Sequence, residues 1–284
     1  MKTIKTKLVL VILIVSFAAN GQSFTGKAIY KTSRKSNFKI EEKNSTISED
    51  MKKELQARIL KMNQKTFLLH FDQKTSTYKE DIPLDVPAPQ LGGGNGIMIK
   101  TFGGSGNGSI YFKDINEKRY VYQTEIMGKR FLIKDTLPNY KWELSSETKN
   151  IGKYTCYKAF FTREVTNKEM TIEDGEAVEK EVKKEMTTTA WYTTQVPISN
   201  GPDHYQGLPG LILELNDGEQ TIVCTEIVLN SSEKITIVAP NKGEVVSQQK
   251  FDKIQDEKTK ELMERFKSRK GSGSGNVIKI EVGG

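Results

Sequence analysis

Residues 201–218 constrain the fold of this chain more than any other stretch, because they combine two Pro/Gly corners, a strand and a turn. In the tetrapeptide Leu208-Pro209-Gly210-Leu211, Pro209 fixes φ at the second position and Gly210 tolerates φ > 0 at the third. The tetrapeptide therefore predicts a type II turn that leads into a strand.

The residues after this turn predict a β-hairpin. Alternation in a strand places three leucines on one face: Leu211, Leu213 and Leu215. Asp217-Gly218 is typical of a two-residue hairpin turn. With that turn, Leu213 would stand opposite Ile222, and Leu211 opposite Cys224. We therefore expect Cys224 to point to the leucine face.

The N-terminus has the pattern of a secretory signal peptide. Three lysines come first (Lys2, Lys5 and Lys7), an apolar run follows over 8–15, and small residues lead to a cleavage site after Gly21. The run is shorter than the roughly 20 apolar residues that span a bilayer. We expect residues 1–21 to be removed and the protein to be exported, to the periplasm or in association with the outer membrane.

Charge and hydropathy limit the partners. Loss of the three lysines, with no acidic residue, would reduce the formal net charge from +7 to +4. Basic residues alternate with acidic ones, so nucleic acid is not an expected partner. No later apolar run approaches 20 residues, so we expect no transmembrane segment in the mature chain.

The chain has two cysteines, Cys156 and Cys224. In an oxidising compartment, a structural disulfide between them is the simplest interpretation. It would require the strand that carries Cys156 to lie next to the 211–224 hairpin, on the same side. No CxxC or Cys/His cluster indicates redox chemistry or a metal site.

Most of the chain predicts strands. Alternating or aromatic-rich runs, separated by turn residues, lie at 24–33, 67–71, 76–80, 109–113, 119–126, 130–135, 139–144, 154–161, 187–196 and 234–238. Mixed-charge residues 163–186 predict a long solvated hairpin or loop. Helices are predicted at 46–62, which begins with a capping box and carries an apolar stripe, and at the charged segment 251–270.

We therefore expect a single β-rich domain over 22–250, then the charged helix over 251–270. A flexible linker and a short terminal strand should follow over 271–284. Glycines gather at 92–108, but this segment lacks the GxxxxGK[ST] and GxGxxG patterns and no helix follows it. A glycine-rich loop, and no phosphate site or other cofactor site, is predicted there.

The chain has only two histidines, His70 and His204, and this small number limits the catalytic and metal sites that it could form. No GxSxG motif and no HExxH motif accompany them, so no catalytic residue and no metal ligand is assigned. Asp203-His204 is the most enzyme-like pair, although adjacent strand residues point to opposite faces and Asp203 would then orient His204 poorly.

Aromatic residues offer a different kind of site. Trp191, Tyr192 and Tyr205, together with His204, could form a surface that binds a sugar, a peptide or a lipid, or they could simply fill the core. Paired carboxylates for glycoside hydrolysis have no distinctive spacing.

The hexapeptide Gly207-Leu208-Pro209-Gly210-Leu211-Ile212 resembles the motif that names the GLPGLI family, exported proteins of the Bacteroidota without an assigned function. The resemblance extends over about 120–225, through the blocks at 131–135, Trp142, 151–159 and 190–193. It implies an envelope location and, by looser analogy, a mainly β (α+β) fold. That fold would be one large curved antiparallel sheet, half-barrel-like, with one or two helices packed on it.

Two functional hypotheses follow. The first is a non-enzymatic envelope protein that binds an apolar or peptide-like ligand, or a membrane-protein partner, on the curved sheet. The alternative is an envelope hydrolase that uses His204 with a nearby carboxylate or serine. The resemblance supplies no catalytic residues and no cofactor, and the partner could be an envelope protein, a peptide or a lipid.

Overall fold

The structure is a computed structural model that describes residues 24–34, 50, 64–82, 108–173, 176–231 and 235–269. Several predicted segments lie outside the described residues: the signal peptide 1–21, the helix 46–62 apart from Asp50, the glycine-rich loop 92–108 apart from Gly108, and the terminal segment 271–284.

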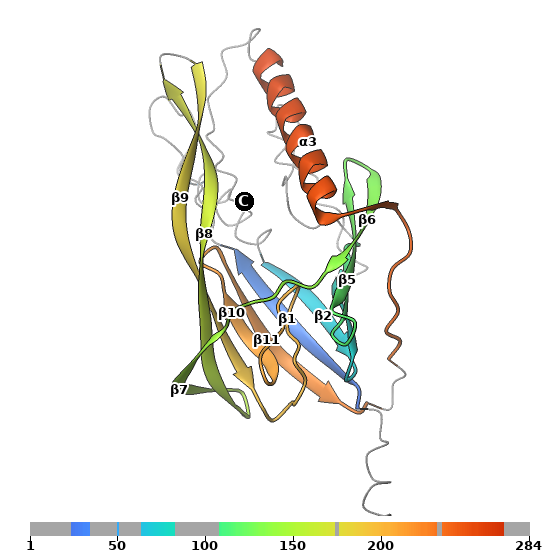
Figure 1. The fold of residues 1–284 in the computed structure, drawn as a ribbon. Helices are drawn as coiled ribbons and strands as arrows, with labels where there is room; N and C mark the ends of the chain where they lie inside the picture. Colours follow the sequence, from blue (N-terminus) through green and yellow to red (C-terminus); the bar gives the residue numbers. More distant parts are fainter. Residues whose placement is uncertain are drawn as a thin grey trace, which may run out of the picture.

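The strands of the described chain form one open, curved sheet of twelve strands (Figure 1). Across the sheet their order is β12 (Glu244–Val246), β6 (Lys129–Thr136), β5 (Arg119–Ile126), β4 (Ile110–Asp114), β3 (Thr75–Glu80), β2 (Gln64–Phe71), β1 (Gly26–Arg34), β11 (Gln220–Leu229), β10 (Leu211–Asn216), β9 (Glu176–Thr193), β8 (Tyr154–Glu173) and β7 (Glu143–Ile151). Every pairing is antiparallel except that of the short edge strand β12 with β6. The predicted mainly β class with one large curved sheet is confirmed.

One face of the sheet, which we call the inner face, carries the main core. Strand alternation directs every second side chain to it. Buried residues on this face include Tyr30, Leu69, Tyr78, Tyr111, Ile133, Ala190, Leu215 and Ile222. Aromatic rings pack in sequence along it, with Phe67 stacked on Tyr78 at 4.8 Å and Tyr111 on Tyr120 at 5.0 Å between ring centroids. Burial of these rings supplies much of the hydrophobic stabilisation.

The opposite, outer face carries a smaller cluster. Phe112, Val121 and Leu132 alternate with the inner residues of β4, β5 and β6, and they are covered by Ile237 and Ala239. Residues 235–240 form no strand, so the strand predicted at 234–238 is wrong where it is described. The apolar residues of that prediction instead cover the outer cluster from a chain segment without a β-ladder.

Helix α3 (Gln248–Arg269) stands beside β6 at one side of the sheet (Figure 1). The Ser247 side chain accepts a hydrogen bond from the Lys250 N–H at 3.3 Å, which caps the helix start. Phe251 packs edge-on against Phe131 at 5.5 Å, so the first turns are anchored in the core. The helix predicted at 251–270 is confirmed, with a start three residues earlier.

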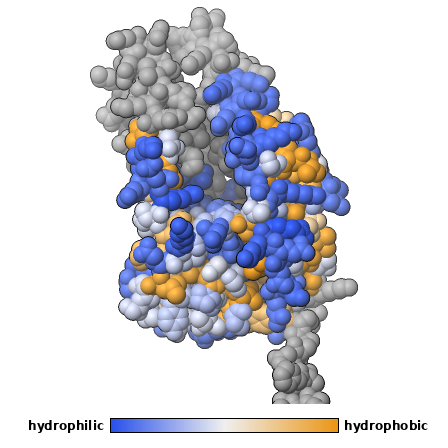
Figure 2. Space-filling model, viewed as in Figure 1, coloured by the Kyte–Doolittle hydropathy of each residue, from blue (hydrophilic) through white to orange (hydrophobic). Residues whose placement is uncertain are grey.

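The visible surface of α3 is mainly hydrophilic (Figure 2), which agrees with its thin apolar stripe. None of the helices in the described ranges is both long enough and apolar enough to cross a membrane.

The long hairpin of β8 and β9 rises on the other side of the sheet (Figure 1). Its ladder continues without interruption from Tyr157–Tyr192 to Glu173–Glu176. The charged segment 163–186 is therefore a hairpin, one of the two predicted alternatives. The strand predicted at 139–144 is instead β7, which begins at Glu143.

The turn between β10 and β11 differs from the prediction. Asn216 pairs with Thr221, so residues 217–220 form a four-residue loop, and Leu215 rather than Leu213 stands opposite Ile222. The Asp217 carboxylate accepts hydrogen bonds from the backbone N–H groups of Glu219 and Gln220 at 3.1 and 2.8 Å. This side-chain turn closes a longer loop than the Asp-Gly pair alone would predict.

Candidate functional site

Residues 194–210 leave β9 and cross the inner face before the chain returns as β10, and we call residues 201–210 the corner. Along this crossing segment Val196, Ile198, Tyr205 and Leu208 are buried. The backbone of Ile212 donates to the Asn200 carbonyl at 2.9 Å, and the Tyr30 hydroxyl donates to the Ile212 carbonyl at 2.7 Å. Backbone and side-chain bonds therefore fix an irregular segment against the sheet.

The predicted type II turn at 208–211 is wrong. Gly210 does not have a positive φ; its N–H donates to the Leu208 carbonyl at 2.8 Å, as in a γ-turn around Pro209. A Cβ at Gly210 would lie 2.1 Å from the Thr193 carbonyl oxygen. Glycine is required here because β9 passes too close for any side chain.

Lys113 is the residue that ties the corner to the sheet. It lies on the inner face of β4, is fully buried, and donates from Nζ to the carbonyl oxygens of Gly201, Asp203 and Tyr205 at 2.6, 2.7 and 3.2 Å. Burial lowers the pKa of Lys113 to about 7, against the opposing effect of the Asp203 charge. One side chain thus satisfies three backbone acceptors that the corner would otherwise leave buried without a donor.

Sequence reasoning missed Lys113. The available signal was its position: in the run 109–113 it shares strand parity with Ser109 and Tyr111, both of which face inward. A lysine at an inward position of a strand requires buried acceptors.

Asp203 and His204 form a close pair. They lie in a turn closed by the Tyr205 N–H and the Pro202 carbonyl, and Asp203 has a left-handed φ of 49°. This conformation brings the Asp203 Oδ2 atom to 3.4 Å from His204 Nδ1. The expectation that Asp203 orients His204 poorly is wrong, because it assumed an extended chain.

The electrostatics of the pair favour an ionised carboxylate. Burial alone would raise the pKa of Asp203, but His204 and Lys113 outweigh it and hold the pKa below its ordinary value. The side chains of Asp203 and His204 remain 37% and 35% exposed, so both groups can be reached from solvent.

Tyrosines surround this pair. His204 lies 4.2 Å from the Tyr205 ring, 6.2 Å from Tyr140 and 6.5 Å from Tyr111, measured between centroids. Tyr140 also stacks on Tyr205 at 5.4 Å. We call Asp203, His204, Tyr111, Tyr140 and Tyr205 the tyrosine–histidine cluster.

Burial is the main cause that raises the pKa of each of the three tyrosines in this cluster, so each keeps its proton at neutral pH. Next to them, the buried Tyr78 hydroxyl has no hydrogen-bond partner among the described residues, and the Asp203 charge contributes to raising its pKa. The cluster therefore presents phenol groups, an imidazole and a carboxylate within one small region.

The other two predicted site residues lie elsewhere. Tyr192 faces inward and contacts Tyr157, while Trp191 points to the opposite face of β9. There the Lys149 ammonium lies 4.3 Å from the Trp191 ring centroid and 2.7 Å from Glu214. The structure thus brings His204 and Tyr205 together and separates Trp191 from them.

The predicted disulfide is not formed, and both cysteines are buried free thiols. Strands β9 and β10 lie between β8 and β11, so the two cysteines are not on neighbouring strands as the prediction required. Burial raises the pKa of Cys156 to about 11 and that of Cys224 to about 12, which suppresses thiolate chemistry.

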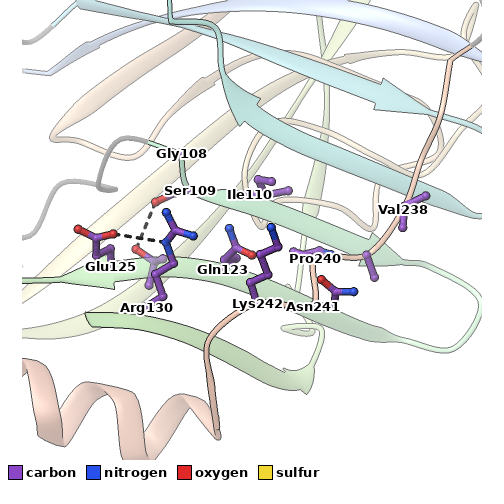
Figure 3. A pocket seen from close by; sticks show the side chains of 12 residues that line it. Gly108, Ser109, Ile110, Gln123, Glu125, Arg130, Val238, Pro240, Asn241 and Lys242 are labelled. Carbon is purple, nitrogen blue, oxygen red and sulfur yellow. Dashed lines mark hydrogen bonds and ion pairs between the residues drawn. The ribbon is translucent and has the colours of Figure 1, made fainter. Parts of the chain in front are cut away.

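No group of three metal-ligating side chains occurs in the part of the chain that the structure describes. A hollow of about 400 Å³ does lie on the outer face, between β4, β5, β6 and residues 238–242 (Figure 3). At one end of it Arg130 turns toward Glu125, with Nε and Oε2 3.6 Å apart. Its charged lining residues are Glu125, Arg130 and Lys242, and no predicted site residue lines it.

Comparisons with known proteins match a described family over only part of the chain. The sequence model of a family described as "Protein of unknown function (Porph_ging)" matches residues 142–214, a span that contains Trp191, the Asp203–His204 pair and the hexapeptide 207–212. No curated protein matches the chain.

Two solved structures of similar shape are those titled "Structure of PNGF-II in C2 space group" and "Structure of PNGF-II in P21 space group". Each has a TM-score of 0.45 and 10% sequence identity to this chain. The matches cover 82% and 81% of this chain, but 32% and 33% of the two solved chains. The chain thus spans about a third of their length, and nothing about activity is carried over from them. Over residues 142–214 the chain is similar to a family of unknown function.

Proposed function

We propose that this is an exported cell-envelope protein that binds, without catalysis, a peptide-like segment at the tyrosine–histidine cluster. The observation that carries the proposal is the cluster itself: a carboxylate and an imidazole, each about one third exposed, beside three tyrosine rings. Such a mixture of apolar rings with a few convergent polar groups is typical of binding sites.

The chemistry of the cluster favours a peptide over a purely apolar ligand. Of the three tyrosines only Tyr140 is partly exposed, whereas Tyr111 and Tyr205 are buried beneath it. Tyr140 can therefore offer ring contact at low conformational cost beside Asp203 and His204. The Asp203 carboxylate, which keeps a lowered pKa, suits a basic side chain or an amide N–H. A lipid tail would satisfy neither Asp203 nor His204.

The position of the cluster also supports binding. Lys113 holds the corner against the sheet through three carbonyl groups, so Asp203 and His204 are pre-organised. Pre-organised groups lose less entropy when a partner binds. Export rests on the pattern of residues 1–21 and on the resemblance to an exported family, and it is tested by the position at which the mature protein begins.

The test uses a photo-crosslinking amino acid at His204 in the protein expressed in its native envelope. A matched variant carries the same group at Val245, which is exposed on the far strand β12. We expect peptide adducts at position 204 that are lost with Asp203→Asn and are absent at position 245. Equal labelling at both positions, or labelling of lipid alone at 204, would contradict the proposal.

The hydrolase alternative has one observation in its favour, the 3.4 Å contact between Asp203 and His204. An aspartate that orients a histidine is part of many hydrolytic sites. However, the described residues place no serine or cysteine side chain in hydrogen-bond contact with His204. Turnover of ester and peptide substrates that disappears with His204→Ala, and persists with His70→Ala, would establish the alternative.

A further inference from the structure

The long strand β8 has an edge that no described strand covers. Its neighbour β7 pairs with β8 only as far as Phe160, whereas β8 pairs with β9 as far as Glu173. The thirteen residues 161–173 therefore have a strand on one side only, over roughly 40 Å at about 3.3 Å per residue. Figure 1 shows this hairpin extending well beyond the end of β7.

An edge of this length exposes a row of backbone N–H and C=O groups that can pair with another strand. Proteins usually prevent such pairing with charged side chains, proline or bulges. This edge has no proline, and the ladder of β8 with β9 has no bulge. Its charges are of both signs, in the order Arg163, Glu164, Lys168, Glu169 and Glu173.

We propose that this edge pairs antiparallel with the same edge of a second copy of the chain, about a two-fold axis at Thr166. In that register Arg163 stands opposite Glu169 of the second copy, and Glu164 opposite Lys168 of the second copy. The two-fold axis repeats both pairs, so each of these four charged positions stands opposite one of the other sign. Glu173 lies outside this register, because its counterpart Ala159 already pairs with Leu144 of β7. Opposite charges at directly facing positions stabilise strand pairs, and like charges destabilise them.

The sequence favours this register over its neighbours. A two-fold axis perpendicular to a sheet passes through a directly opposed pair, so each residue defines one register. An axis at Val165 or at Asn167 leaves every one of the four charges opposite an uncharged residue. An axis at Arg163, Glu164 or Lys168 opposes a charge to its own copy. Only the axis at Thr166 pairs all four.

Intramolecular interactions must coexist with this arrangement, and Arg163 also acts electrostatically on Tyr140 and Tyr205. Glu164 already accepts a hydrogen bond from Lys183 of β9 at 2.9 Å, and both side chains are more than 60% exposed. A carboxylate has two oxygens and accepts from two cations at once. Glu164 can therefore keep its bond to Lys183 and still accept from a second cation.

The test measures the mass of the mature protein in solution by analytical ultracentrifugation over a range of concentrations. We expect a dimer whose dissociation constant rises at least tenfold with Arg163→Glu, and again with higher salt. The double variant Arg163→Glu/Glu169→Arg restores the pairing and should return the dissociation constant to that of the wild type. Lys184→Glu changes the charge equally on β9, away from the edge, and serves as the control.

Mixing two single variants gives the most direct test of the proposed register. Arg163→Glu alone and Glu169→Arg alone should each be mainly monomeric, and together they should form a heterodimer, because each change compensates the other across the axis. A monomeric wild type at all concentrations would overturn the proposal. So would a dimer that is insensitive to Arg163→Glu, or a double variant that fails to recover. Circular dichroism confirms that each variant is folded.

Discussion

The corner at 201–210 and the β8–β9 hairpin show two opposite ways of holding a backbone in place. The corner has no regular hydrogen-bond ladder, yet Lys113 and the close approach of β9 at Gly210 hold it against the sheet. The hairpin has an uninterrupted ladder, but beyond Phe160 no other described strand pairs with β8. The corner is therefore held by buried polar contacts and close packing, whereas the outer part of the hairpin is held by a strand ladder.

Two lysines illustrate the same difference between the corner and the hairpin. Lys113 is fully buried and bonds three carbonyls, whereas Lys183 is mainly exposed and bonds one carboxylate. Removing a donor from buried acceptors costs far more than removing a surface ion pair. The predictions below test this contrast in order of expected size.

Replacing Lys113 with Met should have the largest effect. The substitution keeps the apolar stem but leaves the carbonyls of Gly201, Asp203 and Tyr205 without their donor. At about 1–3 kcal/mol for each unsatisfied buried group, we expect the free energy of unfolding to fall by about 3 kcal/mol or more. Urea unfolding measures it, and a loss below about 1 kcal/mol would show that the corner does not depend on Lys113.

Replacing Gly210 with Ala should come next. The added Cβ would lie 2.1 Å from the Thr193 carbonyl oxygen, so β9 or the corner has to move. Overpacking of this kind costs about 1–3 kcal/mol. Gly128→Ala, in a turn with open space around the added Cβ, is a control for strain from a positive φ alone. If only the Gly128 variant lost stability, the close approach would not be the cause.

The stability should also depend on pH through Lys113. Its pKa is about 7 in the folded protein and about 10.5 when unfolded. Between these values the unfolded state binds the extra proton, so the free energy of unfolding rises with pH, by up to about 1.4 kcal/mol per pH unit. The contribution of Lys113 to the free energy of unfolding is complete above its pKa in the unfolded chain, about 10.5, and is lost below pH 7. Unfolding of wild type and Lys113→Met from pH 6.5 to 9.5 should give diverging curves; parallel curves would mean an unshifted pKa.

Replacing Lys183 with Ala should have the smallest effect. The Lys183–Glu164 pair is exposed to solvent, and such pairs contribute at most about 1 kcal/mol. We expect a change within about 0.5 kcal/mol in the free energy of unfolding, measured by the same urea titration. A loss as large as that of Lys113→Met would remove the contrast between the two regions.

Much of the fold could be predicted because strand alternation is a local signal. The runs at 24–33, 119–126 and 130–135 correspond to β1, β5 and β6, and the resemblance implied the curved sheet. The register of β10 with β11 could not be predicted from Asp217-Gly218, because the Asp217 side chain closes a longer loop. The prediction of a disulfide is wrong for a non-local reason, because two strands lie between the strands that carry the cysteines.

The candidate site was predicted only in part, and the missing part is tertiary. His204 and Tyr205 were named, but their neighbours Tyr111 and Tyr140 come from segments more than 60 residues away in sequence. The left-handed φ of Asp203, which makes the pair with His204 possible, has no signal in an Asp-His dipeptide. Gly210 was expected for its φ and is needed for its missing side chain.

Hydrogen exchange tests the central claim most directly, namely that Lys113 holds the corner that presents His204. Exchange of backbone amides over residues 199–212 and over β8–β9 would be compared between wild type and Lys113→Met under native conditions. We predict that protection falls strongly over 199–212, while the hairpin amides of 161–173 keep their wild-type rates. Unchanged protection at the corner, or an equal loss in both regions, would contradict the account.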